Sequence, residues 1–286
     1  MEKITYLVAN FNNGRYIQDC LDSLNLQTNP NWLCLILDDH STDNSLDIIK
    51  PHLNDKIRLI ENDSNMGYVF SLNKLIERAK TDIVAILDAD DALYPEATEY
   101  LLKIYDENPD AGFVYSKYRN FDEKLEQGYD IHGSAVPVNK TSLQEGLISH
   151  IKSFRISCYQ KTKGLDESIL YAEDRDLVYK LEEVATPIFV DRVLYKHRYV
   201  PDSQSTSKVK IEIGTYNHFR AVKNAVKRRS IRGIHKWFYY SIHYGKYVCT
   251  CGRYSKTTIS ITQKISQIFQ KLDGIIKLGI TGQLRR

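Results

Sequence analysis

The sequence lacks the long uncharged apolar segments that membrane-spanning helices require. No apolar run of about 18 residues occurs anywhere in the chain. The apolar run at the N-terminus is also too short for a secretory signal peptide. The five cysteines are odd in number and lie mostly in apolar runs, which is typical of free thiols in a reducing compartment. We therefore expect a cytoplasmic protein, with peripheral attachment to the inner face of the cytoplasmic membrane left open.

Two glycine-rich nucleotide-binding motifs are missing as well. The pattern Gly-x-Gly-x-x-Gly does not follow the first predicted strand, and no P-loop pattern occurs. These absences argue against NAD or FAD enzymes and against P-loop ATPases and kinases. A nucleotidyltransferase would need a glycine-rich basic loop near residues 9–15, where only Gly14 and Arg15 are present. A bound nucleotide would therefore have to be held by acidic residues and a metal ion.

Acidic residues are scarce in one part of the chain, residues 208–286. This region contains 17 Lys and Arg residues against two acids, whereas residues 1–207 carry a net charge of −12. Such a charge division predicts two regions with different roles and an anionic partner for the basic one. Its basic amphipathic helices, with Trp and Tyr at the polar boundary, favour an anionic membrane surface. Packing on the acidic body or homo-oligomerisation is the alternative, and nucleic acid is the least favoured partner.

Two apolar patterns stand out within this basic region. Four residues share one helical face between basic side chains: Tyr216, Phe219, Val222 and Val226. Residues 261–275 repeat Ile and Leu at a heptad-like spacing, which Gly274 weakens. We expect a mainly helical C-terminal extension.

Apolar runs of strand length alternate with helical patterns in the rest of the chain. The predicted strands are residues 3–9, 32–37, 56–60, 83–87 and 112–116, and amphipathic helices follow the first four. Ser41 or Thr42 is the expected N-cap of the second helix. This alternation with short loops predicts an α/β fold with a mostly parallel sheet. Residues 119–145 are polar and poorly patterned, and we interpret them as a candidate substrate-facing loop or lid.

Acidic residues follow two of these strands. Asp38 and Asp39 come after the second strand, and Asp88, Asp90 and Asp91 come after the fourth. Ligands of parallel α/β sheets bind at the carboxyl ends of the strands. Clustered carboxylates repel one another unless a cation lies among them, and oxygen ligands suit Mg²⁺ or Mn²⁺. The sequence therefore predicts a metal-assisted nucleotide site, with a polar strand-to-helix loop as the alternative.

A second acidic group begins a later helix that carries Leu177, Val178 and Leu181. Glu173, Asp174 and Asp176 lie in its first turn. Acids at this position can simply complement the helix dipole, which is worth about 0.3–1 kcal/mol each. They can also supply the base that a metal-assisted transfer needs for its nucleophile.

An ordered series of motifs resembles the inverting family 2 glycosyltransferases with the GT-A fold. The resemblance extends to about residue 205. It rests on Asn10-Phe11-Asn12, Ser23-Leu-Asn-Leu-Gln-Thr28, Leu37-Asp-Asp-His-Ser-Thr-Asp43, Asn65-Met-Gly67, Leu72-Asn73, Leu87-Asp-Ala-Asp-Asp91, Gly164-Leu-Asp-Glu167 and Glu173-Asp174-Arg-Asp-Leu177.

The resemblance implies a role for each matching residue. The donor nucleotide would contact Ala9, Asn10, Phe11, Asp39, Gly67, Asp88, Ala89 and Asp90. Asp90 or Asp91 would hold Mn²⁺ or Mg²⁺ bridging the diphosphate, and Asp174 matches the catalytic base. Glu173 and His197 are further candidates, although His197 lies earlier than the family's histidine and Val200 occupies that place.

The implied activity is transfer of a sugar from a nucleotide-sugar, such as a UDP-sugar, to a glycan or a lipid-linked acceptor in the synthesis of a bacterial surface polysaccharide. The expected domains are a catalytic domain at 1–207, divided into a nucleotide-binding half at 1–91 and an acceptor-binding half at 92–207, and the basic extension at 208–286. A non-catalytic membrane-associated scaffold with a decayed transferase domain is the alternative. Asp39, Asp90, Asp91 and Asp174 are all present, which argues against decay.

Overall fold

The protein consists of two compact units. The computed structural model describes residues 3–201, 203, 206–233, 235–237, 239–241 and 243. The first unit comprises Met1–Ser168 and Leu177–Pro201, and the second comprises Ile169–Asp176 and Asp202–Arg286. The heptad-like residues 261–275 lie outside the described residues. The domain division expected at residue 207 stays a prediction.

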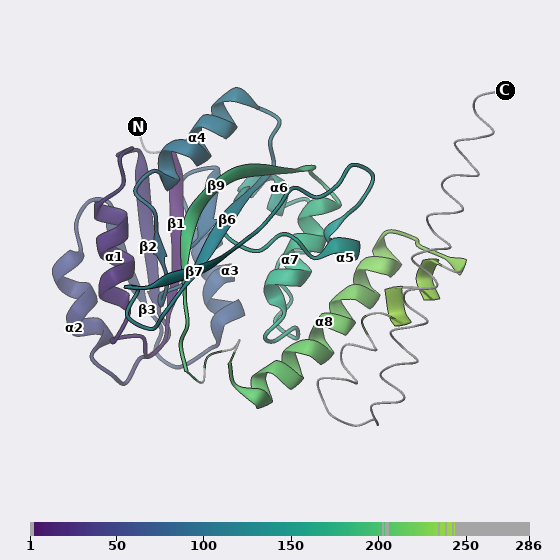
Figure 1. Ribbon diagram of the computed structural model, residues 1–286. Coiled ribbons are helices and arrows are strands. Elements are labelled where there is room, and N and C mark those ends of the chain that lie inside the picture. The colour runs from purple at the N-terminus through teal and green to yellow at the C-terminus, as the bar shows by residue number, and fades with distance from the viewer. Residues whose placement is uncertain are drawn as a thin grey trace. The chain divides into compact units, whose positions relative to one another are not determined.

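The first unit is built on one β-sheet (Figure 1). The strands lie in the order β3-β2-β1-β4-β8-β6-β9-β5, and β7 pairs with β6. Their bounds are β1 (Ile4–Asn10), β2 (Trp32–Asp38), β3 (Ile57–Glu61), β4 (Ile83–Ile86), β5 (Ala92–Leu93), β6 (Phe113–Phe121), β7 (Gly128–His132), β8 (Lys152–Arg155) and β9 (Pro187–Arg198).

The N-terminal half of this sheet is parallel, as the apolar runs predict. β1 pairs with β2 and β4, and β2 pairs with β3, all in parallel register. Near-continuous apolar strands are typical of parallel sheets because both faces are covered. Register places Asn10 opposite Asp38, so the carboxyl ends of β1 and β2 lie side by side. β4 lies on the other side of β1, which brings its acidic end to the same edge.

The other half of the sheet is mixed, so the prediction of a mostly parallel sheet holds only for β1 to β4. β8 runs antiparallel to β4 and to β6, and β5 runs antiparallel to β9. β6 and β9 are parallel. The apolar pattern of a short strand carries no direction, so it could not show that β8 enters the sheet in reverse.

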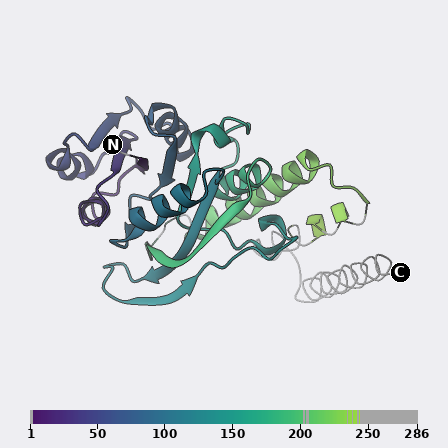
Figure 2. The same ribbon diagram turned by 90° about the horizontal axis from the view of Figure 1, so that it is seen from above.

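The polar segment 119–145 contains two strand segments and a short helix, which corrects the prediction that it is a loop. β6 continues to Phe121 and pairs with β7, with Tyr118 opposite His132, and the two strands run beside each other in Figure 2. A short helix, α5 (Ser142–Glu145), follows. All five residues of β7 are exposed, so no buried apolar face marks this strand.

Helices connect the strands and bury the sheet. The helices of the first unit are α1 (Ile17–Asn25), α2 (Ser45–Ile49), the 3-10 turn η1 (Lys50–His52), α3 (Tyr68–Arg78), α4 (Ala97–Glu107), α5 and α6 (Ile156–Tyr159). Ile4, Tyr6 and Val8 of β1 belong to one core with residues of α1, α2 and α4, while Leu7 points to the other face.

The expected N-cap of α2 is wrong. Asn44 occupies that position, and the Ser41 hydroxyl donates to Asp38 Oδ1 at 2.6 Å. Ser41 therefore stabilises the end of β2. A serine near a helix start can bond to either neighbour, and the buried Asp38 carboxylate is the stronger acceptor.

The second unit contains the start of α7 (Glu173–Glu182) and the long helix α8 (Lys208–Arg228). Of the predicted apolar face of α8, Val222 and Val226 are buried and Phe219 is partly buried, whereas Tyr216 is about half exposed and lies off the buried face. Among the described residues, no helix combines the length and the apolar character needed to cross a lipid bilayer.

Candidate functional site

Three carboxylates follow the carboxyl end of β4. β4 and Leu87 are buried, and Asp88, Asp90 and Asp91 come directly after them. Ala89 and Asp91 are almost inaccessible to solvent, so this segment lies in the protein interior before β5 begins. The position matches the strand-end site that the sequence predicts.

Two tyrosine hydroxyls hold the Asp88 carboxylate. Tyr68 at the start of α3 donates to Asp88 Oδ1 at 2.7 Å, and Tyr195 of β9 donates to Asp88 Oδ2 at 3.3 Å. The Asp88 backbone N–H also donates to the Tyr195 hydroxyl at 3.1 Å. Burial, followed by the charge of Asp88, raises the pKa of Tyr195, so its hydroxyl keeps its proton and remains a donor. The orientation of Asp88 is therefore fixed by α3 and β9 together.

Burial and mutual repulsion dominate the pKa values of the neighbouring carboxylates, and the charge of Arg198 offsets the effect on Asp90 only in part. Burial, and then the charge of Asp88, raises the pKa of Asp90 to about 6. The pKa of Asp91 is also raised, first by burial and then by Asp90 and Asp88. A cation among these groups would reverse the effect of their mutual repulsion. The donor set therefore fits a divalent metal ion, the cofactor class that the sequence predicts.

Arg198 ties this acidic segment to the rest of the unit. Its Nε donates to the Asp90 carbonyl at 2.6 Å, and its backbone N–H donates to Asp91 Oδ1 at 2.7 Å. The guanidinium also reaches the Glu123 carbonyl and the Asp19 carboxylate of α1, each at 2.6 Å. The side chain is 2% exposed. Sequence reasoning missed Arg198, because nothing in its local pattern indicates contacts with segments more than 100 residues away.

The ends of β1 and β2 form a second polar region beside β4. Asn10 Nδ2 donates to Asp38 Oδ1 at 2.7 Å, and the Asp39 N–H donates to the Asn10 carbonyl at 2.8 Å. Phe11 follows Asn10 and is 43% exposed. Ala9 is in β1, opposite Leu37. The predicted nucleotide residues of β1 and β2 are thus brought together, with Phe11 as the exposed aromatic ring.

Asp39 holds the loop before α3. Its Oδ1 accepts from Asn62 Nδ2 at 2.8 Å and from the Met66 N–H at 2.9 Å. Its Oδ2 accepts from the Gly67 N–H at 2.7 Å. Gly67 has φ +93°, a conformation that glycine adopts readily. Asp39 and Gly67 are therefore in direct contact, although 28 residues separate them in sequence.

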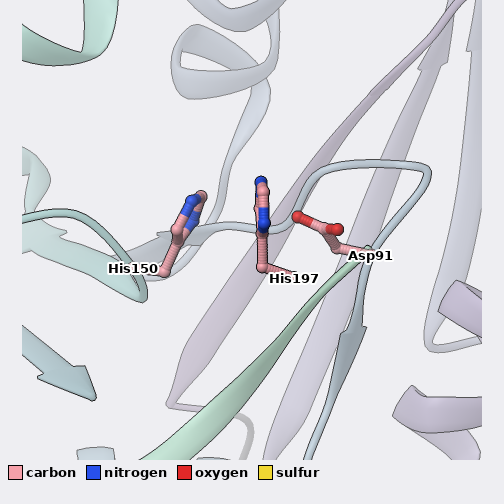
Figure 3. A group of neighbouring side chains, drawn as sticks. All are labelled: Asp91, His150 and His197. Atoms are coloured by element: carbon pink, nitrogen blue, oxygen red, sulfur yellow. The ribbon is translucent and has the colours of Figure 1, made fainter. Parts of the chain in front are cut away.

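Two imidazoles lie near the Asp91 carboxylate. One ligand atom each of Asp91, His150 and His197 falls within 4.8 Å of the others. Figure 3 shows the His197 ring between the His150 ring and the carboxylate. The sequence named His197 as a possible contact but missed His150, which precedes β8 in a segment without a recognisable motif. Topology brings it here, because β8 lies between β4 and β6.

The candidate base belongs to the second unit. Glu173 and Asp174 form the first turn of α7, where Asp174 Oδ1 accepts from the Arg175 N–H at 2.7 Å. Helix α8 holds the backbone that precedes Glu173, because Asn217 Nδ2 donates a hydrogen bond to the Leu170 carbonyl at 2.9 Å. A Cβ on Gly214 would lie 2.6 Å from the Tyr171 carbonyl oxygen, so only glycine allows this approach.

Comparison with known proteins shows related sequences among synthases. Residues 5–164 match the family described as Glycosyl transferase family 2. Chondroitin synthase of Escherichia coli is 28% identical over 236 residues, covering 80% of this chain and 33% of that protein. Hyaluronan synthase of Pasteurella multocida is 29% identical over 234 residues, covering 80% of this chain and 23% of that protein. The chain thus spans about a third or less of the length of these relatives.

Solved structures show the fold. S. aureus TarS 1-349 in complex with UDP superposes with a TM-score of 0.66 at 18% identity, covering 89% of this chain and 73% of that one. Mannosyltransferase PcManGT from Pyrobaculum calidifontis, in complex with GDP-Man and Mn²⁺, gives 0.62 at 15% identity, covering 99% and 80%. The predicted GT-A fold is confirmed. Because the family match covers more than half of the sequence, the chain belongs to glycosyl transferase family 2.

Proposed function

We propose that the chain transfers a sugar, with inversion, from a UDP-sugar to a hydroxyl group of a glycan or a lipid-linked acceptor, in the synthesis of a surface polysaccharide. The proposal rests on the position of the acidic segment Asp88–Asp91 beside the adjacent carboxyl ends of β1 and β2, in a chain of this family. The relatives named chondroitin synthase and hyaluronan synthase support a polysaccharide product. TarS has been solved with UDP-GlcNAc, which supports a nucleotide-sugar donor.

The donor would lie across the carboxyl ends of β1, β2 and β4. Phe11 offers an aromatic face for the base, and Asp39 lies at the end of the neighbouring strand. Asp88 is held by two tyrosines at the place where a ribose hydroxyl could be accepted. Asp90 and Asp91 would hold the cation. When bound, a divalent cation neutralises the negative charge that develops on the departing diphosphate.

Asp174 would take the proton of the acceptor hydroxyl as that oxygen attacks the anomeric carbon. A carboxylate within hydrogen-bond reach makes the oxygen a better nucleophile as the bond forms. The sugar–phosphate bond breaks as the new bond forms on the opposite face, so one displacement inverts the anomeric configuration. Glu173 precedes the base in the same turn and is buried.

Incubation of the chain with UDP-sugars, Mn²⁺ and a glycan acceptor is expected to release UDP and form a glycoside of inverted configuration. Coupled detection of UDP identifies the donor, and proton NMR of the product gives the anomeric configuration. A product that retains the donor's configuration would contradict the single displacement. Absence of UDP release and glycoside formation with every nucleotide-sugar and acceptor tested would favour the non-catalytic scaffold.

The exposed face of α8 would contact an anionic membrane surface. Val209, Ile213 and Tyr216 are exposed and recur at a spacing of four and three residues, so they share one helical face. Lys223 and Lys227 continue this face toward the end of the helix. Exposed apolar residues combined with basic ones are typical of helices that lie in a membrane interface.

Replacement of these three apolar residues by serine is expected to reduce sedimentation of the full chain with phosphatidylglycerol vesicles. The substitutions remove the apolar area that enters the interface and leave every basic charge in place. A matched control replaces three exposed apolar residues of the first unit, Leu26, Leu53 and Val138, by serine. Equal sedimentation of both variants would show that α8 does not anchor the chain.

A further inference from the structure

A lysine side chain is buried at the start of β8. Lys152 is 5% exposed, although lysine is almost never buried without a partner. In the part of the chain that the structure describes, its ammonium group makes no hydrogen bond and no ion pair. Removing a charge from water without giving it a partner destabilises a fold. Lys152 is therefore a candidate for binding a negatively charged group of a ligand.

Packing alone does not call for a charged residue at this position. Register places Lys152 opposite Ile86 of β4, and Phe154 follows two residues later on the same face of β8. Ile86 and Phe154 are both buried and apolar. An apolar side chain at position 152 would fill the same place without the cost of desolvating a charge. The ammonium group, rather than the aliphatic stem, thus distinguishes this residue from its neighbours.

The order of the strands places Lys152 away from the proposed nucleotide site. β4 separates β8 from β1 in the sheet, and β2 lies beyond β1. Ile86, opposite Lys152, precedes Asp88 by two residues, so the lysine lies beside the strand that leads into the acidic segment. The donor nucleotide is placed across the ends of β1, β2 and β4. A negatively charged group at Lys152 would therefore belong to the sugar of the donor or to the acceptor.

Several imidazole rings lie on the same side of β4. The Tyr118 ring stacks on His132 at 5.2 Å and meets the rings of His150 and His197 edge-on at 5.1 and 5.8 Å. Burial is the main cause of the lowered pKa of His197, and the charge of Lys152 contributes to it, so the ammonium group lies within electrostatic range of this ring. His132 is exposed. Groups that can donate hydrogen bonds therefore extend from the protein surface toward the lysine.

The charge of one ammonium group limits the chemistry of the ligand. It balances a single negative charge, which is the charge of a carboxylate. The diphosphate of the donor carries more negative charge and is placed at the cation that Asp90 and Asp91 would hold. The compact ammonium head of lysine offers three N–H donors, which suit carboxylate oxygens. Among sugars, the hexuronic acids carry such a carboxylate.

We propose that Lys152 binds the carboxylate of a hexuronic acid, so that the chain acts on an acidic sugar, either as the sugar transferred or as the acceptor. The inference rests on the proposed function, because it names the substrate class of the same transfer. In a buried site the attraction between an ammonium group and a carboxylate is stronger than in water. A neutral sugar would leave the ammonium group unpaired, and this difference makes the site selective.

Calorimetry with two matched pairs of ligands tests the proposal on the full chain. UDP-glucuronic acid and UDP-glucose, each with Mn²⁺, probe the transferred sugar. Methyl glucuronide and methyl glucoside, each added with UDP and Mn²⁺, probe the acceptor. We expect the acidic member of one pair to bind at least about 10-fold more tightly, because leaving one partner of a buried charge pair unpaired costs this much or more. The pair that shows the preference identifies which sugar carries the carboxylate.

Lys152→Met is expected to abolish this preference, because methionine fills a similar volume without a charge. Lys152→Arg should restore part of it, since the guanidinium also donates to carboxylates. Lys161→Met is the matched control: Lys161 is an exposed lysine of the same unit, and its substitution should leave the preference unchanged. Near-ultraviolet circular dichroism verifies that each variant is folded.

Equal affinity of the unmodified chain for both members of both pairs would overturn the proposal, and this result does not depend on whether any variant folds. A preference that Lys152→Met retains would also overturn it. Loss of UDP affinity in Lys152→Met, without a preference within either pair, would place the lysine at the diphosphate instead. UDP is titrated separately: failure to bind UDP would count against the proposed function, whereas UDP binding without a preference for acidic sugars would count against this inference alone.

Discussion

Asp174→Asn is expected to lower kcat by at least about 100-fold while leaving the affinity for UDP unchanged. General-base catalysis typically contributes about 10²- to 10⁴-fold, and an amide cannot accept the acceptor's proton. The substitution should preserve the local structure, because an asparagine Oδ1 can still accept from the Arg175 N–H. The donor would be held by residues of the first unit, which this change does not touch.

Steady-state kinetics with saturating donor, together with calorimetric titration of UDP, separates the two effects. Asp110→Asn is a suitable control, since Asp110 is an exposed carboxylate in the loop before β6. Wild-type turnover of the Asp174→Asn variant would show that Asp174 is not the catalytic base. In that case Glu173, its neighbour in the first turn, would be the next residue to replace.

Residues of α8, which lies in the basic region, contact the segment that carries the candidate base Asp174. Asn217 and Gly214 fasten the backbone at Leu170 and Tyr171, and Arg228 lies 3.8 Å from the Asp176 carboxylate. Tyr171 has φ +60°, a left-handed conformation that costs a residue with a side chain roughly 1–3 kcal/mol. These contacts surround the turn that carries Glu173 and Asp174. The helix is therefore a support for the candidate base within the second unit.

Arg198→Met is expected to destabilise the protein by about 2–4 kcal/mol and to weaken metal and UDP binding. Hydrogen bonds to charged groups contribute about 1.5–3 kcal/mol each, and they are not additive. The arginine makes such bonds to the Asp90 carbonyl, the Glu123 carbonyl and Asp19. Asp19 is half exposed, so solvent screens the ion-pair share of the loss. Methionine fills a similar volume but leaves the two carbonyls without their donor.

Urea unfolding measures the stability change, and calorimetry measures UDP binding in the presence of Mn²⁺. Arg192→Met is the matched control: Arg192 lies in the same strand, is exposed and contacts only the face of Tyr100 among the described contacts of its guanidinium. Its substitution should change stability by less than about 0.5 kcal/mol, as is usual at the surface. Equal stability of the Arg198 variant and the control would show that the acidic segment does not depend on Arg198.

The strands of the parallel half were predictable because each is an apolar run covered on both faces. β1, β2 and β4 end where the apolar residues end, and the acids after β2 and β4 follow from that pattern. β7 was not predictable, because all of its residues are exposed and it contains no apolar run. The extension of β6 through Lys117 and Asn120 was missed for a related reason: pairing with β9, rather than residue type, keeps these polar residues in a strand.

The candidate site likewise contains residues that could be predicted from the sequence and residues that could not. Asp39, Asp88, Asp90 and Asp91 were found from local motifs, since strand ends place their own residues at the site. His150 and Arg198 could not be found, because only the order of strands brings them to the acidic segment. Tyr68 and Tyr195 are similar cases: their hydroxyls meet on Asp88 from two distant elements. Local sequence therefore predicts the groups that bear charge, and tertiary structure supplies the groups that orient them.

The most direct test of the account is titration of UDP into the full chain, with Mn²⁺ and again with excess EDTA. The account predicts binding with Mn²⁺ and at least about 10-fold weaker binding after chelation, because burial and the charge of Asp88 raise the pKa of Asp90 and a cation would offset this repulsion. Asp90→Ala should bind UDP weakly under both conditions. UDP affinity that is the same with and without EDTA would contradict a metal-held diphosphate at Asp88–Asp91.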